Sequence, residues 1–172
     1  MSRLYVLDAG PLFSGWTRTR TGGSFATVPG VIDEIRNRSS IRRVEFLMSS
    51  GRLSVEYPDS HDLMLVRSCA QNIGDGHHLS ETDISLIALA LTKMKQGHRV
   101  ILVSSDLALL NTASHLSVRV SDIEGRFRFQ ARWSFSCPGC GMSSTTAPPD
   151  LECPVCGTKM VRRLTGRQAY FD

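Results

Sequence analysis

The sequence predicts an α/β fold, in which helices cover a mostly parallel sheet, followed by a small C-terminal module built around cysteines. In the first two thirds of the 172-residue chain, short apolar runs alternate with segments of helical periodicity. Such alternation is typical of parallel strands that are buried on both faces. From Gly125 the pattern changes to strict alternation of apolar and polar side chains, which indicates one extended strand. Two Cys-x-x-Cys pairs come after that strand, so we expect two structural parts.

Turn and capping residues delimit the elements of the N-terminal part. The apolar run at 4–7 ends at Asp8-Ala9-Gly10-Pro11, which indicates a strand that stops at a turn. Residues 17–24 contain no apolar side chain and predict a mobile loop. Thr27 is placed to cap a helix that Pro29 opens. The next expected elements are a helix at 41–48, closed by Gly51, and a strand at 53–57.

The later elements of this part are predicted by periodicity and by one strong capping signal. Apolar residues recur at helical spacing over 63–73, and Gly74-Asp75-Gly76 ends that helix. Ser80-Glu81-Thr82-Asp83 is similar to a capping box, with Ser80 as the N-cap of a helix that Gly97 closes. The remaining expected elements are a buried strand at 100–103, a helix at 107–115 and a strand at 118–120.

The cysteine spacing predicts a structural metal site. The four ligands would be Cys137, Cys140, Cys153 and Cys156. Four thiolates fill the tetrahedral shell of one Zn²⁺ and leave no position for water, as in the knuckles of a zinc ribbon. Two disulfides or another thiolate-bound metal are the alternatives. Cys69, the fifth cysteine, has apolar helical neighbours and is expected in the core.

The positive charge of the chain is concentrated in its last 47 residues. Residues 1–125 carry 13 basic and 13 acidic side chains, whereas 126–172 carry seven basic and three acidic ones. We expect domains at 1–123 and 124–164, with a tail at 165–172. The second domain would then offer a basic surface for a polyanion such as RNA. The expected RNA contacts are Arg126, Arg128, Arg132, Trp133, Arg162 and Arg163. The aromatic side of the 127–135 strand is expected to be mainly buried.

Four acidic residues stand where an α/β sheet places its chemistry. Asp8 and Asp106 come directly after buried strands, and the carboxyl ends of parallel strands form the ligand-binding edge of such sheets. Glu34 lies on the helix after Pro29, and Asp83 lies in the first turn of another helix. Singly, each acid could be a turn, capping or solvated residue. As a set they suit Mg²⁺ or Mn²⁺, which prefer oxygen ligands and can promote displacement at phosphorus.

The same residues resemble the successive motifs of PIN-domain nucleases. The matching segments are Val6–Phe13, Thr27–Ile35, Leu79–Asp83 and Val103–Asp106. This resemblance implies that Asp8, Glu34, Asp83 and Asp106 are the catalytic, metal-binding acids. It also places Ser104 beside the metal site, and Glu81 is a candidate for a supporting role next to it. Together with the aromatic and arginine-rich strand and the cysteine module, the chain resembles the archaeal Nob-type endonucleases from about residue 4 to about 164.

The resemblance implies a function in the maturation of ribosomal RNA. We expect a metal-dependent hydrolase that cleaves single-stranded RNA at the 3′ end of small-subunit, 16S-type rRNA. The partners would be pre-ribosomal RNA, the nascent small ribosomal subunit and other assembly factors. Two alternatives stay open: a non-catalytic RNA-binding ribosome assembly factor with an inert fold, and a PIN-type toxin ribonuclease, a class that usually lacks a ribbon.

Several other classes of protein find no support in the sequence. A Walker loop, a nucleophile elbow and a dinucleotide fingerprint do not occur. His77 and His78 lie in a glycine-rich loop and are expected to be solvated. There is no secretory apolar segment and no apolar run long enough to span a bilayer. Cysteines that bind zinc must stay reduced, which fits a reducing compartment. We therefore expect a cytoplasmic protein without membrane contact.

Overall fold

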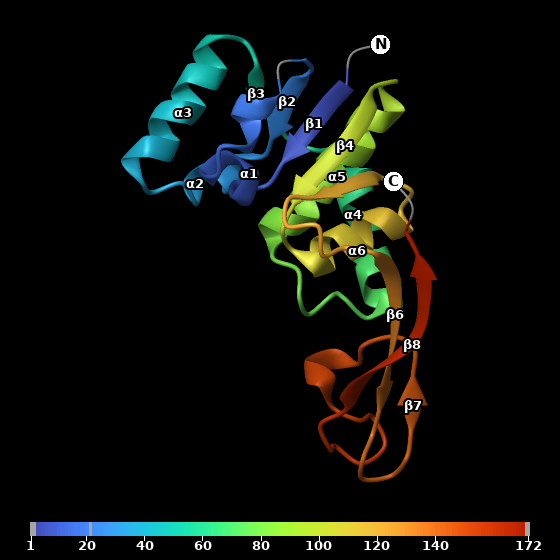
Figure 1. Ribbon diagram of the computed structural model, residues 1–172. Coiled ribbons are helices and arrows are strands. Elements are labelled where there is room, and N and C mark those ends of the chain that lie inside the picture. The colour runs from blue at the N-terminus through green and yellow to red at the C-terminus, as the bar shows by residue number, and fades with distance from the viewer. Residues whose placement is uncertain (1–2, 21, 171–172) are drawn as a thin grey trace.

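The computed structural model describes residues 3–20 and 22–170, which form a five-stranded and a three-stranded sheet (Figure 1). The strands are β1 Arg3–Leu7, β2 Ser24–Thr27, β3 Leu53–Val55, β4 Arg99–Ser104, β5 Arg119–Asp122, β6 Phe129–Ser136, β7 Ser143–Ser144 and β8 Val161–Ala169. The α-helices are α1 Ala9–Phe13, α2 Pro29–Asp33, α3 Arg38–Ser49, α4 Ser60–Ile73, α5 Glu81–Lys95 and α6 Leu107–His115. Single 3₁₀ turns occupy Trp16–Thr19 and Pro149–Leu151. Among these helices, none is long and apolar enough to cross a membrane.

The first sheet has five strands in the order β3-β2-β1-β4-β5, and all neighbours are parallel. The chain moves outward from β1 through β2 to β3 and then crosses back to place β4 on the other side of β1. Parallel strands need such crossovers, and the point where the direction reverses opens a crevice at their carboxyl ends. This reversal lies between β1 and β4, which end in Leu7 and Ser104.

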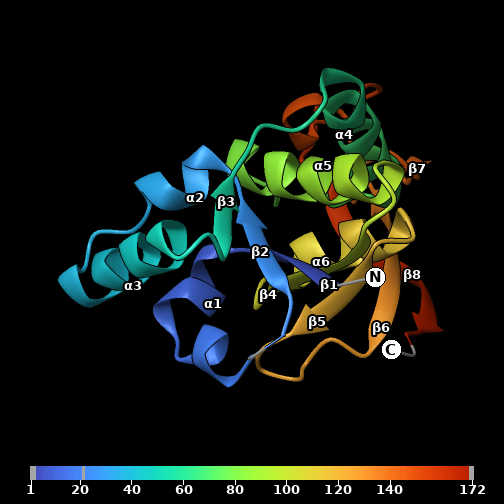
Figure 2. The same ribbon diagram turned by 90° about the horizontal axis from the view of Figure 1, so that it is seen from above.

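Helices cover both faces of the five-stranded sheet, as the sequence predicts. Figure 2 shows α4 and α5 on one side of the strands and α1 with α3 on the other. Helix α5 is the central helix, since every residue from Ile84 to Leu91 except Ser85 is buried. The core includes Val6, Leu7, Ile87 and Leu102, which are all 0% exposed. The predicted α/β fold is therefore confirmed.

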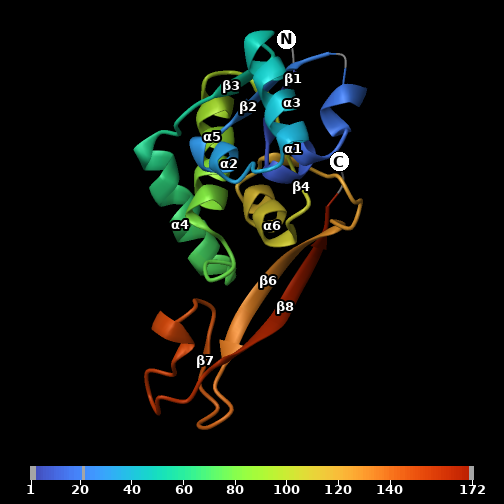
Figure 3. The ribbon, with the colours of Figure 1, turned by 90° about the vertical axis from the view of Figure 1, so that its left-hand side faces the viewer.

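The second sheet has three strands in the order β7-β6-β8, and its long strands β6 and β8 are antiparallel. Figures 1 and 3 show this pair as an arm that begins beside α6 and carries β7 near its far end. We call strands β6 and β8 the arm. A separate small core of Phe135, Cys137, Cys153 and Met160 lies towards the far end of the arm.

Several predicted boundaries differ from the structure because pairing partners were not visible in the sequence. The expected tail at 165–172 is not separate, since β8 continues to Ala169 and pairs with Phe129. The extended strand begins at Phe129 and not at Gly125. In the expected 17–24 loop, Thr17 is buried in a 3₁₀ turn and Ser24 starts β2; residue 21 lies outside the described residues.

Two predicted caps have different outcomes. Thr27 does not cap a helix, because it is the last residue of β2 and its hydroxyl donates to the Leu7 carbonyl at 2.7 Å. Helix α2 begins instead after Val28, with Pro29 in its first turn. The capping box of α5 is confirmed, since Ser80 and Asp83 bond reciprocally.

Candidate active site and nucleic-acid interface

The four predicted acids come from three neighbouring strands and one helix start. Asp8 comes directly after β1, and Asp106 lies two residues beyond the end of β4, the strand paired with β1. Glu34 lies at the end of α2, after β2 on the other side of β1. Asp83 is in the first turn of α5. The parallel sheet thus brings the carboxylates to one edge, at the reversal of strand order.

Ser104 ties two of these acids together. Its buried hydroxyl donates to Asp8 Oδ2 at 2.5 Å and accepts from the Asp106 backbone N–H at 2.9 Å. Asp8 Oδ1 accepts from Ala9 N–H, and Asp106 Oδ1 accepts from the N–H groups of Ala108 and Leu109 as the N-cap of α6. Asp106 Oδ2 takes no hydrogen bond among residues 3–20 and 22–170, so it remains for a ligand.

The pKa values of the other two acids, Glu34 and Asp83, are raised in the folded protein. Burial raises the pKa of Asp83, as do the charges of Asp8 and Asp106, although hydrogen bonds from Ser80 oppose the shift. Partial burial raises the pKa of Glu34, as do the charges of Asp8 and Asp83. Raised carboxylate pKa values are the expected result when like charges share a site without a cation. The oxygen donors and their mutual repulsion therefore fit a hard divalent cation.

The four cysteines form a second, distinct cluster. Their ligand atoms lie within 4.8 Å of one another, and no other group in the described part of the chain meets that criterion for a metal site. The sulfurs of Cys137 and Cys156 are 3.4 Å apart, and those of Cys140 and Cys153 are 3.6 Å apart. Disulfide sulfurs are about 2.05 Å apart, and sulfurs around tetrahedral zinc are about 3.8 Å apart. The arrangement therefore fits a bound metal and not disulfides.

The predicted RNA-binding residues do not all face solvent. Arg162 forms an ion pair with buried Asp75, and its guanidinium lies 3.9 Å from the Trp133 ring centroid. These two predicted RNA contacts are therefore only partly exposed, because Arg162 is engaged with Trp133 and with Asp75, which requires a charged partner. Arg132 and Arg163 are exposed.

Cys69 is half-buried, and burial raises the pKa of its thiol.

Arg126 and Arg128 lie just before β6 in the chain, and Arg126 contacts the segment that carries Asp106. Both side chains are exposed. Arg126 donates to the Ser105 carbonyl at 2.8 Å and pairs with Glu124 at 2.9 Å, which holds its guanidinium against the residue that precedes Asp106. Ser104 lies at the acids as expected, whereas Glu81 pairs with Arg67 on α4 and lies in the first turn of α5.

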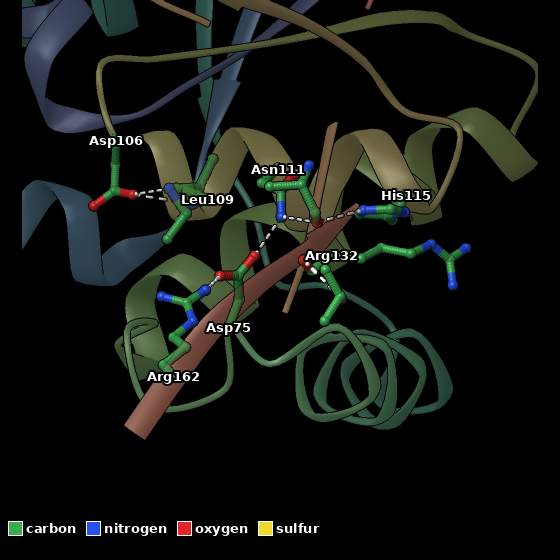
Figure 4. Close-up of polar contacts among 10 residues, drawn as sticks. Asp75, Asp106, Leu109, Asn111, His115, Arg132 and Arg162 are labelled. Carbon is green, nitrogen blue, oxygen red and sulfur yellow. Dashed lines mark hydrogen bonds and ion pairs between the residues drawn. The ribbon is translucent and has the colours of Figure 1, made fainter. Parts of the chain in front are cut away.

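A polar connection between α6 and the arm was missed by the sequence analysis (Figure 4). The Asn111 side chain exchanges two hydrogen bonds with the Ala131 backbone, at 2.6 and 3.0 Å, and also donates to Asp75. His115 contacts the same Ala131 carbonyl at 3.0 Å. Asn111 and His115 lie on the helix that Asp106 caps, so α6 joins the acid cluster to the arm. No periodic signal marks these residues in the sequence.

Comparison with known proteins identifies the family. Residues 5–92 match the PIN domain of ribonuclease. The chain is 32% identical to the endoribonuclease Nob1 of Archaeoglobus fulgidus over 161 residues, which cover 93% of this chain and 90% of that protein. The chain belongs to the Nob1 family of PIN-domain endoribonucleases. The Nob1 endoribonuclease of Pyrococcus abyssi is 31% identical and is covered over 84% of its length.

A second group of PIN proteins is also related. Ribonuclease VapC3 of Aeropyrum pernix is 36% identical over 115 residues, which cover 67% of this chain and 82% of that protein. The Nob1 alignments extend over 93% and 83% of this chain. The five-stranded sheet is therefore the PIN domain, and the similarity to the Nob1 relatives also extends into the C-terminal part of the chain.

Proposed function

We propose that this protein uses Mg²⁺ or Mn²⁺ to hydrolyse single-stranded RNA at the 3′ end of small-subunit, 16S-type rRNA. The single observation that supports the chemistry is that four carboxylates lie around the edge where the strand order reverses, near enough for the Asp8 charge to raise the pKa of both Glu34 and Asp83. Nob1-family membership supports ribosomal RNA as the substrate, since a yeast relative is named a 20S-pre-rRNA D-site endonuclease. That relative is covered over only 19% of its length.

The acids would hold the divalent cation at the edge of the sheet. Asp8, Glu34, Asp83 and Asp106 would supply the oxygen ligands, and a bound Mg²⁺ or Mn²⁺ supplies Lewis-acid chemistry for phosphodiester hydrolysis. Ser104 and the α6 N-terminus fix two of the carboxylates before a ligand arrives. Water would attack phosphorus, leaving a 5′-phosphate and a 3′-hydroxyl.

The cysteine cluster would hold one structural Zn²⁺ through Cys137, Cys140, Cys153 and Cys156. The exposed arginines Arg126, Arg128, Arg132 and Arg163 would contact RNA phosphates. We propose that the protein acts in the cytoplasm on pre-ribosomal RNA in the nascent small subunit, beside other assembly factors.

The test of catalysis is cleavage of an RNA that spans the mature small-subunit 3′ end, with and without Mn²⁺. Asp8→Asn and Asp106→Asn should each reduce the cleavage rate by more than about 100-fold, the loss caused by changing even an outer partner of a metal ligand. Glu45→Gln, on the exposed side of α3, is the matched control and should cut normally.

Wild-type rates for both Asn variants would remove the acids from the mechanism. Binding without any cutting would favour the assembly-factor alternative, and equal cutting of unrelated RNAs would favour a toxin-like ribonuclease.

A separate measurement tests the RNA contacts. Replacing Arg126, Arg128 and Arg132 together with Ala should weaken binding and lower the salt slope by up to about 2, at roughly 0.7 per lost phosphate contact for single strands. Binding is measured across a salt series, with Arg36→Ala, Arg38→Ala and Arg42→Ala combined as a control of equal charge. Equal slopes for the wild type and the first triple variant would show that these arginines do not hold the RNA.

A further inference from the structure

A groove of about 490 Å³ lies between α6 and the arm, directly beside the acid cluster. Asp106 and Leu107, at the start of α6, line one part of it, and Trp133 and Leu164 on the arm line another. Since Asp106 belongs to the proposed catalytic set, a polymer bound at the acids can continue into this groove. We call it the α6–arm groove.

The lining of the groove combines exposed apolar surfaces with positive charge. Phe129 is 48% exposed, Leu107 is 44% exposed and Leu164 is 38% exposed, so the expected burial of the aromatic stripe is wrong at Phe129. The basic lining residues include Arg126, Arg128 and Arg167. Of the two acidic lining residues, Asp75 is paired with Arg162, and Asp106 belongs to the acid cluster at one end of the groove. An anionic ligand with flat apolar groups matches this surface.

The aromatic rings Trp133 and Phe129 of the groove differ in what covers them. The Arg162 guanidinium stacks on Trp133 at 3.9 Å from the ring centroid and occupies that ring. The Arg167 guanidinium lies 5.9 Å from the Phe129 centroid, and the Phe129 side chain stays open to solvent. Phe127, the third aromatic lining residue, packs against Tyr170 and the main core. Phe129 is therefore the aromatic surface that remains for a ligand, with a cation close to it.

We propose that the α6–arm groove binds one or two unpaired nucleotides next to the scissile bond, with a base stacked on Phe129. The proposal rests on the proposed function, because it takes the acid cluster as the cutting site. Backbone phosphates lie against Arg126 and Arg128 at the end of the groove nearest Asp106. Pockets of about 300–1,000 Å³ bury one small ligand, so the groove has room for nucleotides but not for a duplex. Base stacking on an aromatic ring tolerates any sequence, and the groove thereby selects unpaired RNA.

The experiment uses the full chain without added Mn²⁺, so that the RNA stays uncut. A set of RNAs carries one 5-iodouridine each, at successive positions across the mature small-subunit 3′ end, and light-induced crosslinks are mapped by mass spectrometry. Crosslinks to Phe129 should come from only one or two neighbouring positions beside the expected cut.

Variants test the energetic contribution of the ring. Phe129→Ala should weaken binding of the unmodified RNA about tenfold, since an aromatic ring that stacks on one base contributes measurably to single-strand affinity. Phe129→Tyr keeps the aromatic face and should restore affinity, which separates stacking from any effect on folding. Phe46→Ala, at a 66% exposed aromatic residue on α3, is the control and should bind as the wild type does.

The outcomes separate this proposal from the proposed function. Cutting with Mn²⁺, combined with crosslinks elsewhere and unchanged binding of Phe129→Ala, overturns the groove proposal and leaves the nuclease intact. Crosslinks to Phe129 in a protein that never cuts RNA support the groove and refute the nuclease. Absence of RNA binding refutes both, and the groove would then be open to a segment of a protein partner.

Discussion

At the scale of single residues, local hydrogen bonds orient the acids before any cation binds. Ser104 holds the Asp8 carboxylate and the Asp106 backbone, and Ser80 holds Asp83 in its capping box. These three aspartates also have ordinary structural tasks as helix caps or first-turn residues. The structural and the catalytic interpretations of these residues are therefore compatible, because a carboxylate that accepts these hydrogen bonds still has lone pairs for a ligand.

The charge cluster should reduce the stability of the protein when no divalent cation is present. Partial burial and the charges of Asp8 and Asp83 raise the pKa of Glu34 in the fold above its ordinary value of 4.5, so folding disfavours the ionised form. The penalty is absent below the unfolded pKa, develops as pH rises through the folded pKa and is complete above it. Glu34→Gln should therefore raise the melting temperature at pH 7 but change little near pH 4.

Thermal unfolding between pH 4 and pH 8, in buffer without Mg²⁺ or Mn²⁺, measures this difference. Both proteins keep the four cysteines, so any zinc loss at low pH affects them equally. Added Mn²⁺ should stabilise the wild type more than Glu34→Gln. A variant that gains nothing at pH 7, or gains equally at both pH values, would contradict the proposed repulsion.

At the scale of elements, α6 connects the acid cluster to the arm. Asp106 caps the helix at its start, and Asn111 and His115 bind the backbone of β6 further along it. The end of α4 also approaches the arm closely. A Cβ at Gly74 would lie 2.9 Å from Trp133 Cβ and 3.1 Å from Phe135 Cε2, so only glycine fits there.

Gly74→Ala should destabilise the protein by about 2–4 kcal/mol, because the φ of 81° is left-handed and the new methyl group meets the arm. Gly97→Ala is a matched control, since its φ is 87° and a Cβ there would meet nothing within 4 Å. The control should lose only about 1 kcal/mol through backbone strain. Urea unfolding measures both values, and equal losses would show that the α4–arm contact does not contribute to stability.

At the scale of the whole molecule, the PIN domain and the cysteine cluster hold opposite ends of the arm. Asn111 holds β6 to the PIN domain through Ala131, and Arg162, which lies at the start of β8 opposite Phe135, reaches back to Asp75. The small core around Cys137 and Cys153 holds the far part. The position of the cysteine cluster relative to the acids thus depends on these contacts together with the pairing of β6 and β8.

Zinc removal should therefore unfold only the far end of the arm. The purified protein should contain about one zinc per chain, and Cys156→Ser should abolish tight binding. Hydrogen exchange should then increase over 137–160, while the PIN domain and the near part of β6 stay protected. Isolated protein without zinc and without free thiols would contradict the site and indicate disulfides. Global unfolding of the variant would show that the cluster also stabilises the PIN domain.

The sequence by itself determined the features that arise from residues close together along the chain. The Cys-x-x-Cys pairs place two sulfurs in one turn, and the Ser80–Asp83 box closes within one helical turn, so spacing alone predicted both. The placement of Asp8 and Asp106 at one edge was also predictable, because parallel strands bring their carboxyl ends together. Their catalytic roles remain predictions, as does the domain boundary at 123.

Only the tertiary structure decided how the arm meets the PIN domain. Asp75 bonds Asn111 across 36 residues and Arg162 across 87, and no periodic pattern or local turn signal encodes such pairs. The ion pair with Asp75 also goes with the Arg162 guanidinium lying over Trp133, whereas Phe129 is exposed. Alternation along a strand shows which side chains share a face, but whether that face is buried depends on which distant element packs against it.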